Sequence, residues 1–494
     1  MKRVRIFLAN VGLRRPLYPL VTPPMGLLYL AAYLRQRFDA DIRVVTQKLD
    51  NCSNDHLVRQ AQNFGADVVG LSALTPAAYG LNPITAGIRR ALPEALIVLG
   101  GPHVSSFGIR SLDDNGAHAA VAGEGELAFE AILREYFEGG SLANVPGLFW
   151  RSGDGETVAN PGAVPPIMDL DSLPFPAYDL IDVPAFWRRQ SMPPIPRRKY
   201  VSLFSSRGCP YHCNYCHRIF GKVYRVHSAE RIVDEIAFFQ HKYGVQDFEF
   251  LDDIFNLDHR RVIEFCDLVH RRNLHIKIAF PNAVRGDILT EEEIAALKDA
   301  GMYFCSFALE SGSPRIQQVM GKRLDIPRFV NNIALTAAKG VFTNGFNMLG
   351  FPTETAADMQ MTIDVASQSR LHTASFFTVT PFPNTDVYNT AMQLCPDQIA
   401  KLDYTDMDFG AVAVNLSAEP DDVLFRYQRE ANRRFFLKTP SRLFRMIRDF
   451  PQPHLLPLYL PHFIHRATKG QFGSHGSAPI APAVEERPGI SSRE

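Results

Sequence analysis

Three closely spaced cysteines constrain this chain more than any other feature of its sequence. Cys209, Cys213 and Cys216 lie in the run Ser-Arg-Gly-Cys-Pro-Tyr-His-Cys-Asn-Tyr-Cys-His, with the spacing C-x3-C-x2-C. A tight loop with this spacing can place three thiolates on three corners of a [4Fe–4S] cubane. The fourth iron would then have no protein ligand and could bind a substrate, just as catalytic metal sites keep a free position.

Zinc and disulfide sites are the alternatives for these cysteines. A structural zinc site usually shows two paired motifs, whereas the other cysteines are scattered singly, at Cys52, Cys266, Cys305 and Cys395. A disulfide framework is not expected in a chain of 494 residues that begins without a secretory signal. The spacing therefore favours an iron–sulfur cluster.

The cysteine loop resembles that of the radical S-adenosylmethionine (SAM) enzymes. In that family the open iron chelates the amino and carboxylate groups of SAM. An electron from the cluster then breaks the S–C5′ bond and yields a 5′-deoxyadenosyl radical. The resemblance implies that Cys209, Cys213 and Cys216 are the catalytic cluster ligands, that SAM is a cofactor, and that a flavodoxin or ferredoxin donates the electron.

Composition and charge narrow the classes of partner. Lys and Arg together number 52, as do Asp and Glu, so there is no global electrostatic case for nucleic acid. No apolar run approaches the roughly 20 residues that span a bilayer. Because free thiols and an iron–sulfur cluster suit a reducing compartment, we expect a cytoplasmic protein.

The chain divides into five parts by its patterning. Residues 1–140 alternate strand and helix patterns, and the Pro- and Gly-rich residues 141–196 predict a linker that crosses a domain surface outside any core. Residues 197–395 alternate strands and helices again, 396–470 predict a helical C-terminal region, and 471–494 predict a disordered tail. The length itself suggests two to four domains at about 150 residues each.

Both alternating parts predict parallel α/β sheets. In the first part, continuous apolar strands predict a flavodoxin-like sheet with helices on both faces; these strands are 4–8, 41–46, 68–72, 96–99 and 119–122. In the second part the predicted strands are 201–205, 247–251, 275–280, 303–310, 342–349 and 373–378. Six such units are too few to close an eight-stranded barrel. They fit the open, six-stranded partial barrel of radical SAM enzymes.

Motifs at the ends of the later strands also resemble radical SAM segments, because ligands gather at the carboxyl ends of parallel strands. The SAM-binding residues that the resemblance implies are Tyr215, Asp252, Glu310, Ser311, Gly350 and Pro352. Tyr215 would lie beside the adenine, and Glu310 would bind the ribose or amino group together with Ser311. A structural alternative stays open for each: a carboxylate that ends a strand often caps the next helix, and Gly-Phe-Pro can be a simple turn.

Short motifs in the first part resemble those of cobalamin-binding domains. The matches are S-x-L at 72–74, Gly-Gly at 100–101 and Gly-Glu-Gly-Glu at 123–126. The implied cobalamin-binding residues are Ser72, Leu74, Gly100, Gly101, His103, Gly123 and Glu124. The family's D-x-H-x-x-G signature is absent, because residues 10–20 contain no histidine. The lower cobalt ligand is therefore in doubt, and His103 is expected to contact the nucleotide tail or to pack. A domain that has lost its ligand is the alternative.

Together the motifs resemble the cobalamin (B12)-binding radical SAM family, of the class B methyltransferase type, over about residues 1–395. The resemblance implies methylation of an unactivated carbon in a small-molecule or lipid-like metabolite, with two SAM molecules used in each cycle. Two alternatives remain: a cobalamin-dependent radical oxidoreductase or cyclase without methyl transfer, and a non-catalytic cobalamin or redox-sensing module.

The C-terminal region holds a basic and aromatic stretch. Residues 421–438 predict a helix, and the stretch 425–448 is interpreted as a basic, aromatic helix with arginines among phenylalanines and leucines. Such a helix can pack on the barrel with a solvated cationic face, or it can make a peripheral contact with an anionic membrane. Residues 450–465 contain four prolines and cannot form one regular helix.

Overall fold

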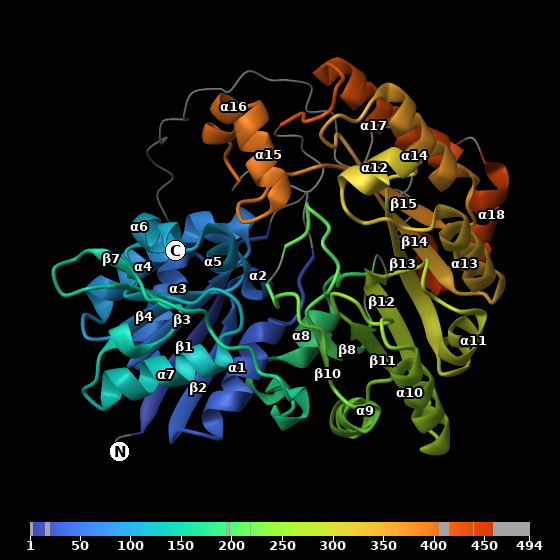
Figure 1. Ribbon diagram of the computed structural model, residues 1–494. Coiled ribbons are helices and arrows are strands. Elements are labelled where there is room, and N and C mark those ends of the chain that lie inside the picture. The colour runs from blue at the N-terminus through green and yellow to red at the C-terminus, as the bar shows by residue number, and fades with distance from the viewer. Residues whose placement is uncertain are drawn as a thin grey trace, which may run out of the picture.

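Two large sheets, each covered by helices, lie side by side in the chain (Figure 1). The computed structural model describes residues 3–14, 20–193, 195, 198–217, 219–404, 414–437 and 439–457. The predicted α/β fold class, with a flavodoxin-like domain, a partial barrel and a helical C-terminal region, is confirmed.

The first sheet has the strand order β2-β1-β3-β4-β5-β6-β7. Its strands are β1 (Val4–Val11), β2 (Ala40–Thr46), β3 (Val68–Ala73), β4 (Leu96–Gly100), β5 (Ala119–Ala120), β6 (Phe149–Arg151) and β7 (Thr157–Ala159). The first five run parallel in the flavodoxin order 2-1-3-4-5. Because helices cover both faces, the centre of β1 is fully buried on both sides.

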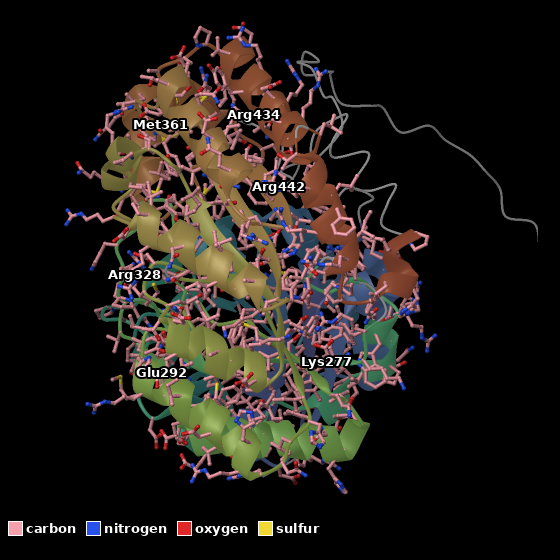
Figure 2. The ribbon with its side chains drawn as sticks, turned by 90° about the vertical axis from the view of Figure 1, so that its right-hand side faces the viewer. Lys277, Glu292, Arg328, Met361, Arg434 and Arg442 are labelled. Atoms are coloured by element: carbon pink, nitrogen blue, oxygen red, sulfur yellow. The ribbon has the colours of Figure 1, made fainter. Side chains whose placement is uncertain are left out.

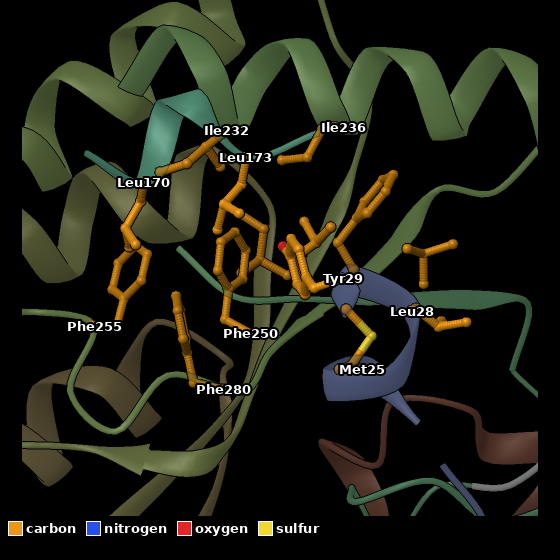
Figure 3. Close-up of a cluster of buried hydrophobic side chains, with 14 of the residues drawn as sticks. Met25, Leu28, Tyr29, Leu170, Leu173, Ile232, Ile236, Phe250, Phe255 and Phe280 are labelled. Carbon is orange, nitrogen blue, oxygen red and sulfur yellow. The ribbon is translucent and has the colours of Figure 1, made fainter. Parts of the chain in front are cut away.

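Helices of the first domain connect these strands. They are α1 (Met25–Arg35), α2 (Gln47–Asp50), α3 (Asn54–Phe64), α4 (Leu81–Ala91), α5 (Pro102–Phe107), α6 (Arg110–Asn115) and α7 (Glu126–Phe137), with a 3-10 turn at Thr75–Gly80. Helix α1 is buried on almost every side, apart from Gly26 and Arg35. A helix that is apolar all round lies inside a protein, and α1 packs between the first sheet and the barrel (Figure 3).

The second sheet is a parallel, open barrel with the order β15-β14-β13-β12-β11-β8. Its strands are β8 (Tyr200–Leu203), β11 (Asp247–Phe250), β12 (Lys277–Val284), β13 (Met302–Glu310), β14 (Phe342–Leu349) and β15 (Thr373–Thr378). Its helices are α9 (Ala229–Tyr243), α10 (His259–Arg271), α11 (Glu291–Asp299), α12 (Pro314–Val319), α13 (Ile326–Ala338), α14 (Ala356–Gln368), α15 (Asp386–Leu394) and α16 (Pro396–Ala400). Within the described residues β8 and β15 do not pair, so the barrel stays open as predicted.

The prediction that residues 141–196 form a linker outside any core is wrong, because much of this segment belongs to the folded core. Strands β6 and β7 extend the first sheet as an antiparallel hairpin. The segment continues through 3-10 turns at Leu142–Asn144, Leu170–Ser172 and Tyr178–Leu180 and helix α8 (Val183–Trp187). Leu170 and Leu173 are buried in the cluster that also contains residues of α1, α9 and the barrel (Figure 3). The prolines set turns between short elements, and they do not keep the neighbouring side chains out of the core.

Part of this segment also covers the edge strand of the barrel. The Tyr178 hydroxyl donates to the Ser202 carbonyl and accepts from the Ser202 amide, both at 2.9 Å. The Trp187 indole donates to the carbonyl of Tyr200 at 2.9 Å. An uncovered edge strand exposes unpaired amides and carbonyls. On β8, these two side chains supply hydrogen-bond partners for the amide and carbonyl of Ser202 and for the carbonyl of Tyr200.

The predicted helix over 421–438 is confirmed as α17 (Asp421–Leu437), whereas the basic stretch 425–448 is not one helix, because its last part belongs to α18 (Pro440–Arg448). Pro440 stands in the first turn of α18, a position that tolerates the missing amide of proline. Helix α17 packs on the barrel as one alternative expected, with the Phe435 ring 6.2 Å from that of Phe376.

Arg442 fastens α18 to the barrel (Figure 2). Its buried guanidinium donates to the carbonyls of Ser367, Ser369, Leu371 and Phe435. After α18 the described chain ends with a 3-10 turn at Pro453–Leu455. The rest of the irregular stretch 450–465 and the predicted tail 471–494 lie outside the described residues. In the part of the chain that the structure describes, no helix has both the length and the apolar character to cross a bilayer.

The edge contact of Tyr178 yields a stability prediction. Tyr178→Phe should lower the free energy of unfolding by about 1–3 kcal/mol, because the amide and carbonyl of Ser202 lose their partner in a buried place. Tyr243→Phe is the matched control, since the Tyr243 hydroxyl has no hydrogen-bond partner among the described residues. Denaturant titration measures both variants, and equal midpoints would contradict the role given to Tyr178.

Candidate functional site

A cavity of about 510 Å³ lies between the two domains. From the first sheet it is lined at the carboxyl ends of the strands, by Asn10, Ser72 and Gly100 among others. From the barrel it is lined by Leu251 and Asp253, which directly follow β11. The carboxyl ends of parallel strands are where α/β folds bind ligands, and here two sheets direct those ends to one space.

Two glycine turns form the wall on the side of the first sheet. Gly101 and Gly123 both have φ of +84°, a conformation that side chains rarely adopt. A Cβ on Gly101 would lie 2.3 Å from the Ser72 Oγ, so this close approach needs glycine. The Ser105 Oγ donates to the Gly101 carbonyl at 3.1 Å and accepts from the Gly123 amide at 3.0 Å. Ser105 therefore fixes the two turns relative to each other, a role that the sequence motifs did not indicate.

The predicted cobalamin-binding residues separate into two groups. Ser72, Leu74, Gly100, Gly101, Gly123 and Glu124 all line the cavity. His103 is not among the lining residues; it is buried in α5, with its ring 4.6 Å from that of Phe107. Burial lowers the pKa of His103 to about 4, and Arg110 adds to the shift. His103 thus packs on Phe107, which is one of the two roles expected for it, and its contact with a nucleotide tail stays a prediction.

Gly26 is a cavity residue that the sequence motifs missed. It lies in the first turn of α1, whose neighbouring residues are buried, and it faces the cavity. A Cβ on Gly26 would meet no protein atom within 4 Å. A glycine inside a helix costs stability relative to alanine, so Gly26 itself was a signal that bare backbone is needed there.

The cysteine loop is held by the barrel loops around it. It lies between two short antiparallel strands, β9 (Ser206–Arg207) and β10 (Arg225–Val226). Gly208 has φ of +85°, and a Cβ there would lie 2.3 Å from the Val223 carbonyl oxygen. The Asn214 amide donates to the carbonyl of Met320, and the Asn214 carbonyl accepts from the amide of Val387, both at 2.9 Å.

The three thiols of this loop are free in the structure. Cys209 and Cys213 are partly buried and Cys216 is exposed. Burial raises the pKa of the Cys209 thiol, and the charges of Asp253 and Cys213 raise it further against a hydrogen bond from the Tyr211 amide. Within the described residues no three His, Cys, Asp or Glu side chains converge as metal ligands. Burial raises the pKa of the Cys216 thiol, and the charges of Asp253, Cys213 and Cys209 raise it further, so the thiols still interact. A bound metal would have to draw the three thiols together and stabilise them as thiolates.

Several predicted SAM-binding residues gather around the cysteine loop. The Tyr215 ring contacts that of Phe351 edge to face, with centroids 5.6 Å apart. Burial raises the pKa of Tyr215, and the nearby charge of Glu310 adds to the shift. Glu310 ends β13 with φ of +63°, and its carboxylate lies 3.3 Å from the Lys322 Nζ. Strained backbone of this kind, at a non-glycine residue, is typical of functional sites.

The turn after β14 is rigidly capped. Gly350 has φ of +91°, and the buried Glu354 carboxylate accepts from the amides of Gly350 and Phe351 at 2.5 and 3.0 Å. Burial raises the pKa of Glu354 to about 8 in spite of these hydrogen bonds. Pro352 is buried within the same turn. The Gly-Phe-Pro segment is thus fixed against Tyr215 through Phe351.

Two other predicted SAM-binding residues lie in the interior. Ser311 is fully buried, with its Oγ 3.2 Å from that of Thr362. The buried Asp252 carboxylate accepts from the Ser205 amide and the hydroxyls of Ser205 and Ser206. Asp252 does not cap the next helix, since the N-cap of α10 is Asp258, and the binding of SAM by Asp252 and Ser311 stays a prediction. Asp253 instead lines the cavity, and burial together with the charge of Asp252 raises its pKa to about 6.

Two family models match the chain, one in each of its two α/β domains. The B12 binding domain model matches residues 18–133, and the Radical SAM superfamily model matches residues 203–366. An uncharacterized methyltransferase of Pyrococcus horikoshii is 28% identical over 373 residues, which cover 75% of this chain and 78% of the relative. An anaerobic magnesium-protoporphyrin IX monomethyl ester cyclase of Rubrivivax gelatinosus is 27% identical over 429 residues, with 85% and 75% covered.

Among solved structures, the chain resembles the radical SAM methyltransferase TsrM from Kitasatospora setae, which was solved with cobalamin and a [4Fe–4S] cluster bound. The TM-score is 0.65 at 19% identity, and the match covers 80% of this chain and 78% of TsrM. This likeness bears on the fold, and it agrees with the order of the two matched domains. With a match to the B12 binding domain followed by a match to the Radical SAM superfamily, the chain has the domain order of the cobalamin-binding radical SAM enzymes and is similar to them.

Proposed function

We propose that this enzyme transfers a methyl group to an unactivated carbon of a small-molecule or lipid-like metabolite. The observation that carries the proposal is the shared cavity, which glycine turns line from the first sheet and Asp253 and Phe220 line from the radical SAM side. A reaction that needs two cofactors in one space requires such an arrangement. Methyltransferases among the relatives support the choice of reaction.

The residues present fit the implied cofactors. Bare backbone at Gly26, Gly101 and Gly123 leaves the cavity wall free of side chains, as a broad, flat corrin ring requires. On the other side, Cys209, Cys213 and Cys216 would hold a [4Fe–4S] cluster with one open iron. When bound, the cluster and SAM supply a carbon-centred radical, and cobalamin supplies the methyl group.

The contribution of the protein is to position the cofactors and to exclude water. We assign Tyr215, Glu310 and the Gly350–Pro352 turn to SAM, because they are fixed together beside the cysteine loop. Leu74, Phe204 and Leu251 give the cavity an apolar wall that would keep water away from a radical. The electron would come from a flavodoxin or ferredoxin in a reducing cytoplasm.

A second candidate function is radical ring closure or oxidation without methyl transfer. The cyclase of Rubrivivax gelatinosus, which matches 85% of this chain, favours it. Methyl transfer forms one S-adenosylhomocysteine for each product, whereas cyclisation forms none, so counting that by-product separates the two. A non-catalytic cobalamin or redox sensor is the third candidate, and it would not cleave SAM when reduced.

The cluster assignment predicts the behaviour of two cysteine variants. Wild-type protein reconstituted without oxygen should bind about four irons and cleave SAM to 5′-deoxyadenosine when reduced. Cys213→Ala should lose this cleavage, because the cluster loses one of three ligands. Cys395→Ala should keep it, since Cys395 follows α15 and lies outside the C-x3-C-x2-C motif. Cleavage at the wild-type rate by the Cys213 variant would refute the assignment.

The cavity assignment predicts which glycine is essential for cobalamin uptake. Gly26→Trp should place an indole in the cavity, since a Cβ at this position meets no protein atom within 4 Å, and should weaken cobalamin binding by about tenfold or more. Gly153→Trp is the control, because a Cβ there also meets no protein atom within 4 Å but Gly153 lies outside the cavity lining. Absorbance titration with hydroxocobalamin measures both. Failure of wild-type protein to take up cobalamin would leave a cobalamin-independent radical SAM enzyme.

Helix α18 has exposed apolar side chains that suit contact with a membrane, where a lipid-like substrate would be found. Phe444, Leu443 and Ile447 are 65%, 46% and 42% exposed on this helix. Arginines surround them: burial and the charges of Arg370 and Arg448 lower the pKa of Arg445. Exposed apolar side chains among cations suit an anionic bilayer surface, so we include a peripheral membrane contact through α18 in the proposal.

The membrane contact predicts a loss of vesicle binding when exposed apolar side chains of α18 are removed. Replacing Leu443 and Phe444 together by serine should reduce co-sedimentation with phosphatidylglycerol vesicles by about tenfold or more, because two apolar side chains no longer enter the bilayer. Phe137→Ser, which removes an exposed phenylalanine from α7, is the control. If wild-type protein does not sediment with these vesicles at low salt, α18 does not bind membranes.

A further inference from the structure

Four buried charged side chains join the two domains beside the cavity: Glu124, Glu126, Arg207 and Arg225. Their side chains are between 2% and 6% exposed. The two glutamates follow β5 in the first domain, and the two arginines belong to β9 and β10 at the base of the cysteine loop. We call these four residues the charge quartet.

The Glu124 carboxylate bridges the two ends of the cysteine loop. Its Oε2 accepts from the Nη1 of Arg207 at 2.7 Å, and its Oε1 accepts from the Nη2 of Arg225 at 2.5 Å. Arg207 precedes Cys209 and Arg225 follows Cys216, and the two arginines are opposite each other in the β9–β10 pair. Glu126 contacts Arg207 alone, at 2.7 Å, and does not bridge the ends.

The quartet also reaches the cavity and the middle segment. The Arg207 guanidinium lies 5.3 Å from the centre of the Tyr29 ring and 5.4 Å from that of Phe220, and both rings line the cavity. The Nη1 of Arg225 donates to the carbonyl of Ile167 at 2.7 Å. One group of charges thus connects the first domain, the segment between the domains and the cysteine loop.

The charges of the quartet cancel, which is why it can be buried. Burial lowers the pKa of Arg207, but Glu126 and Glu124 raise it above its ordinary value, so the guanidinium stays charged. A buried ion pair contributes little net stability, yet removing one partner leaves an uncompensated charge in the interior. Such a network is therefore better suited to fixing a geometry than to adding stability.

We propose that Glu124 is a positioning residue that holds both ends of the cysteine loop against the cobalamin cavity and so sets the separation of cluster and cobalamin. What the loop and the cavity hold rests on the proposed function. The hold itself is a property of the protein without cofactors. It gives Glu124 a second role beside lining the cavity, because its two carboxylate oxygens are already engaged by arginines.

Three variants separate positioning from a merely structural role. Glu124→Gln keeps the side-chain shape but weakens both contacts of the bridge. Glu126→Gln is the matched control, because it also leaves one buried positive charge in excess but keeps the bridge. Glu124→Gln combined with Arg225→Gln restores charge balance without the bridge, so it should recover thermal stability even if the single variant folds poorly.

Hydrogen exchange on the cofactor-free protein is the first measurement. Amides of residues 208–224 should exchange roughly tenfold faster or more in Glu124→Gln and in the double variant than in wild type, because the loop ends are no longer held. Glu126→Gln should show the smaller change. Wild-type protection in Glu124→Gln, or full recovery of protection in the double variant, would overturn the proposal.

Electron paramagnetic resonance of the reconstituted protein is the second measurement. Iron, sulfide and hydroxocobalamin are added and the protein is reduced, so that the cluster and cobalt(II) are both paramagnetic. Their spin–spin interaction should be weaker or more heterogeneous in Glu124→Gln and the double variant than in Glu126→Gln. An unchanged interaction would overturn the positioning role. If wild-type protein takes up no cobalamin, the proposed function fails, while the exchange experiment still decides on the hold.

Discussion

The burial of helix α1 is the constraint on which the arrangement of the two domains depends. Its apolar residues pack on Ile6 and Leu8 of the first sheet and, on the other side, on the barrel, where the Tyr29 and Phe204 rings lie 6.4 Å apart. One continuous core therefore includes both sheets. Domains joined by small polar interfaces usually move relative to each other, whereas a large apolar interface fixes them. The cavity at this interface is accordingly a defined space.

The charge quartet has a different function within that frame. The close packing of apolar side chains sets the distance between the two sheets. It does not determine the path of the irregular cysteine loop. Directional contacts such as those of Glu124 can do so, because hydrogen-bonded ion pairs depend strongly on geometry. Packing thus places the domains, and buried charge places the loop between them.

Much of the fold could be predicted from the sequence, because a strand that is buried on both faces must be apolar throughout. The runs 68–72 and 96–99 show this pattern and gave strands β3 and β4 to within a residue or two. The glycine motifs at Gly100 and Gly123 pointed to the cavity, because glycines at the ends of strands let the backbone approach a ligand closely. The cysteine loop could be predicted because its spacing is rare.

The remainder depends on contacts between distant residues. Proline content marked 141–196 as a surface linker, and only the partners of Leu170 and Tyr178 show that it is buried. The bonds of Asp252 to Ser205 and Ser206 could not be predicted either, because these serines lie 47 and 46 positions earlier in the chain. The sequence around Arg207 and Arg225 did not indicate their role, because both act through the Glu124 carboxylate, which lies about a hundred positions earlier in the chain.

The cover that Tyr178 places on β8 also bears on how the chain is made. Tyr178 leaves the ribosome 24 residues before Ser202, whereas β11, the neighbour of β8 in the sheet, follows about 45 residues later. Domains fold progressively during synthesis, and unpaired strand edges at that stage attract other chains. The first strand of the barrel thus emerges after the segment that covers its outer edge, so only the edge that β11 later joins is open in the nascent chain.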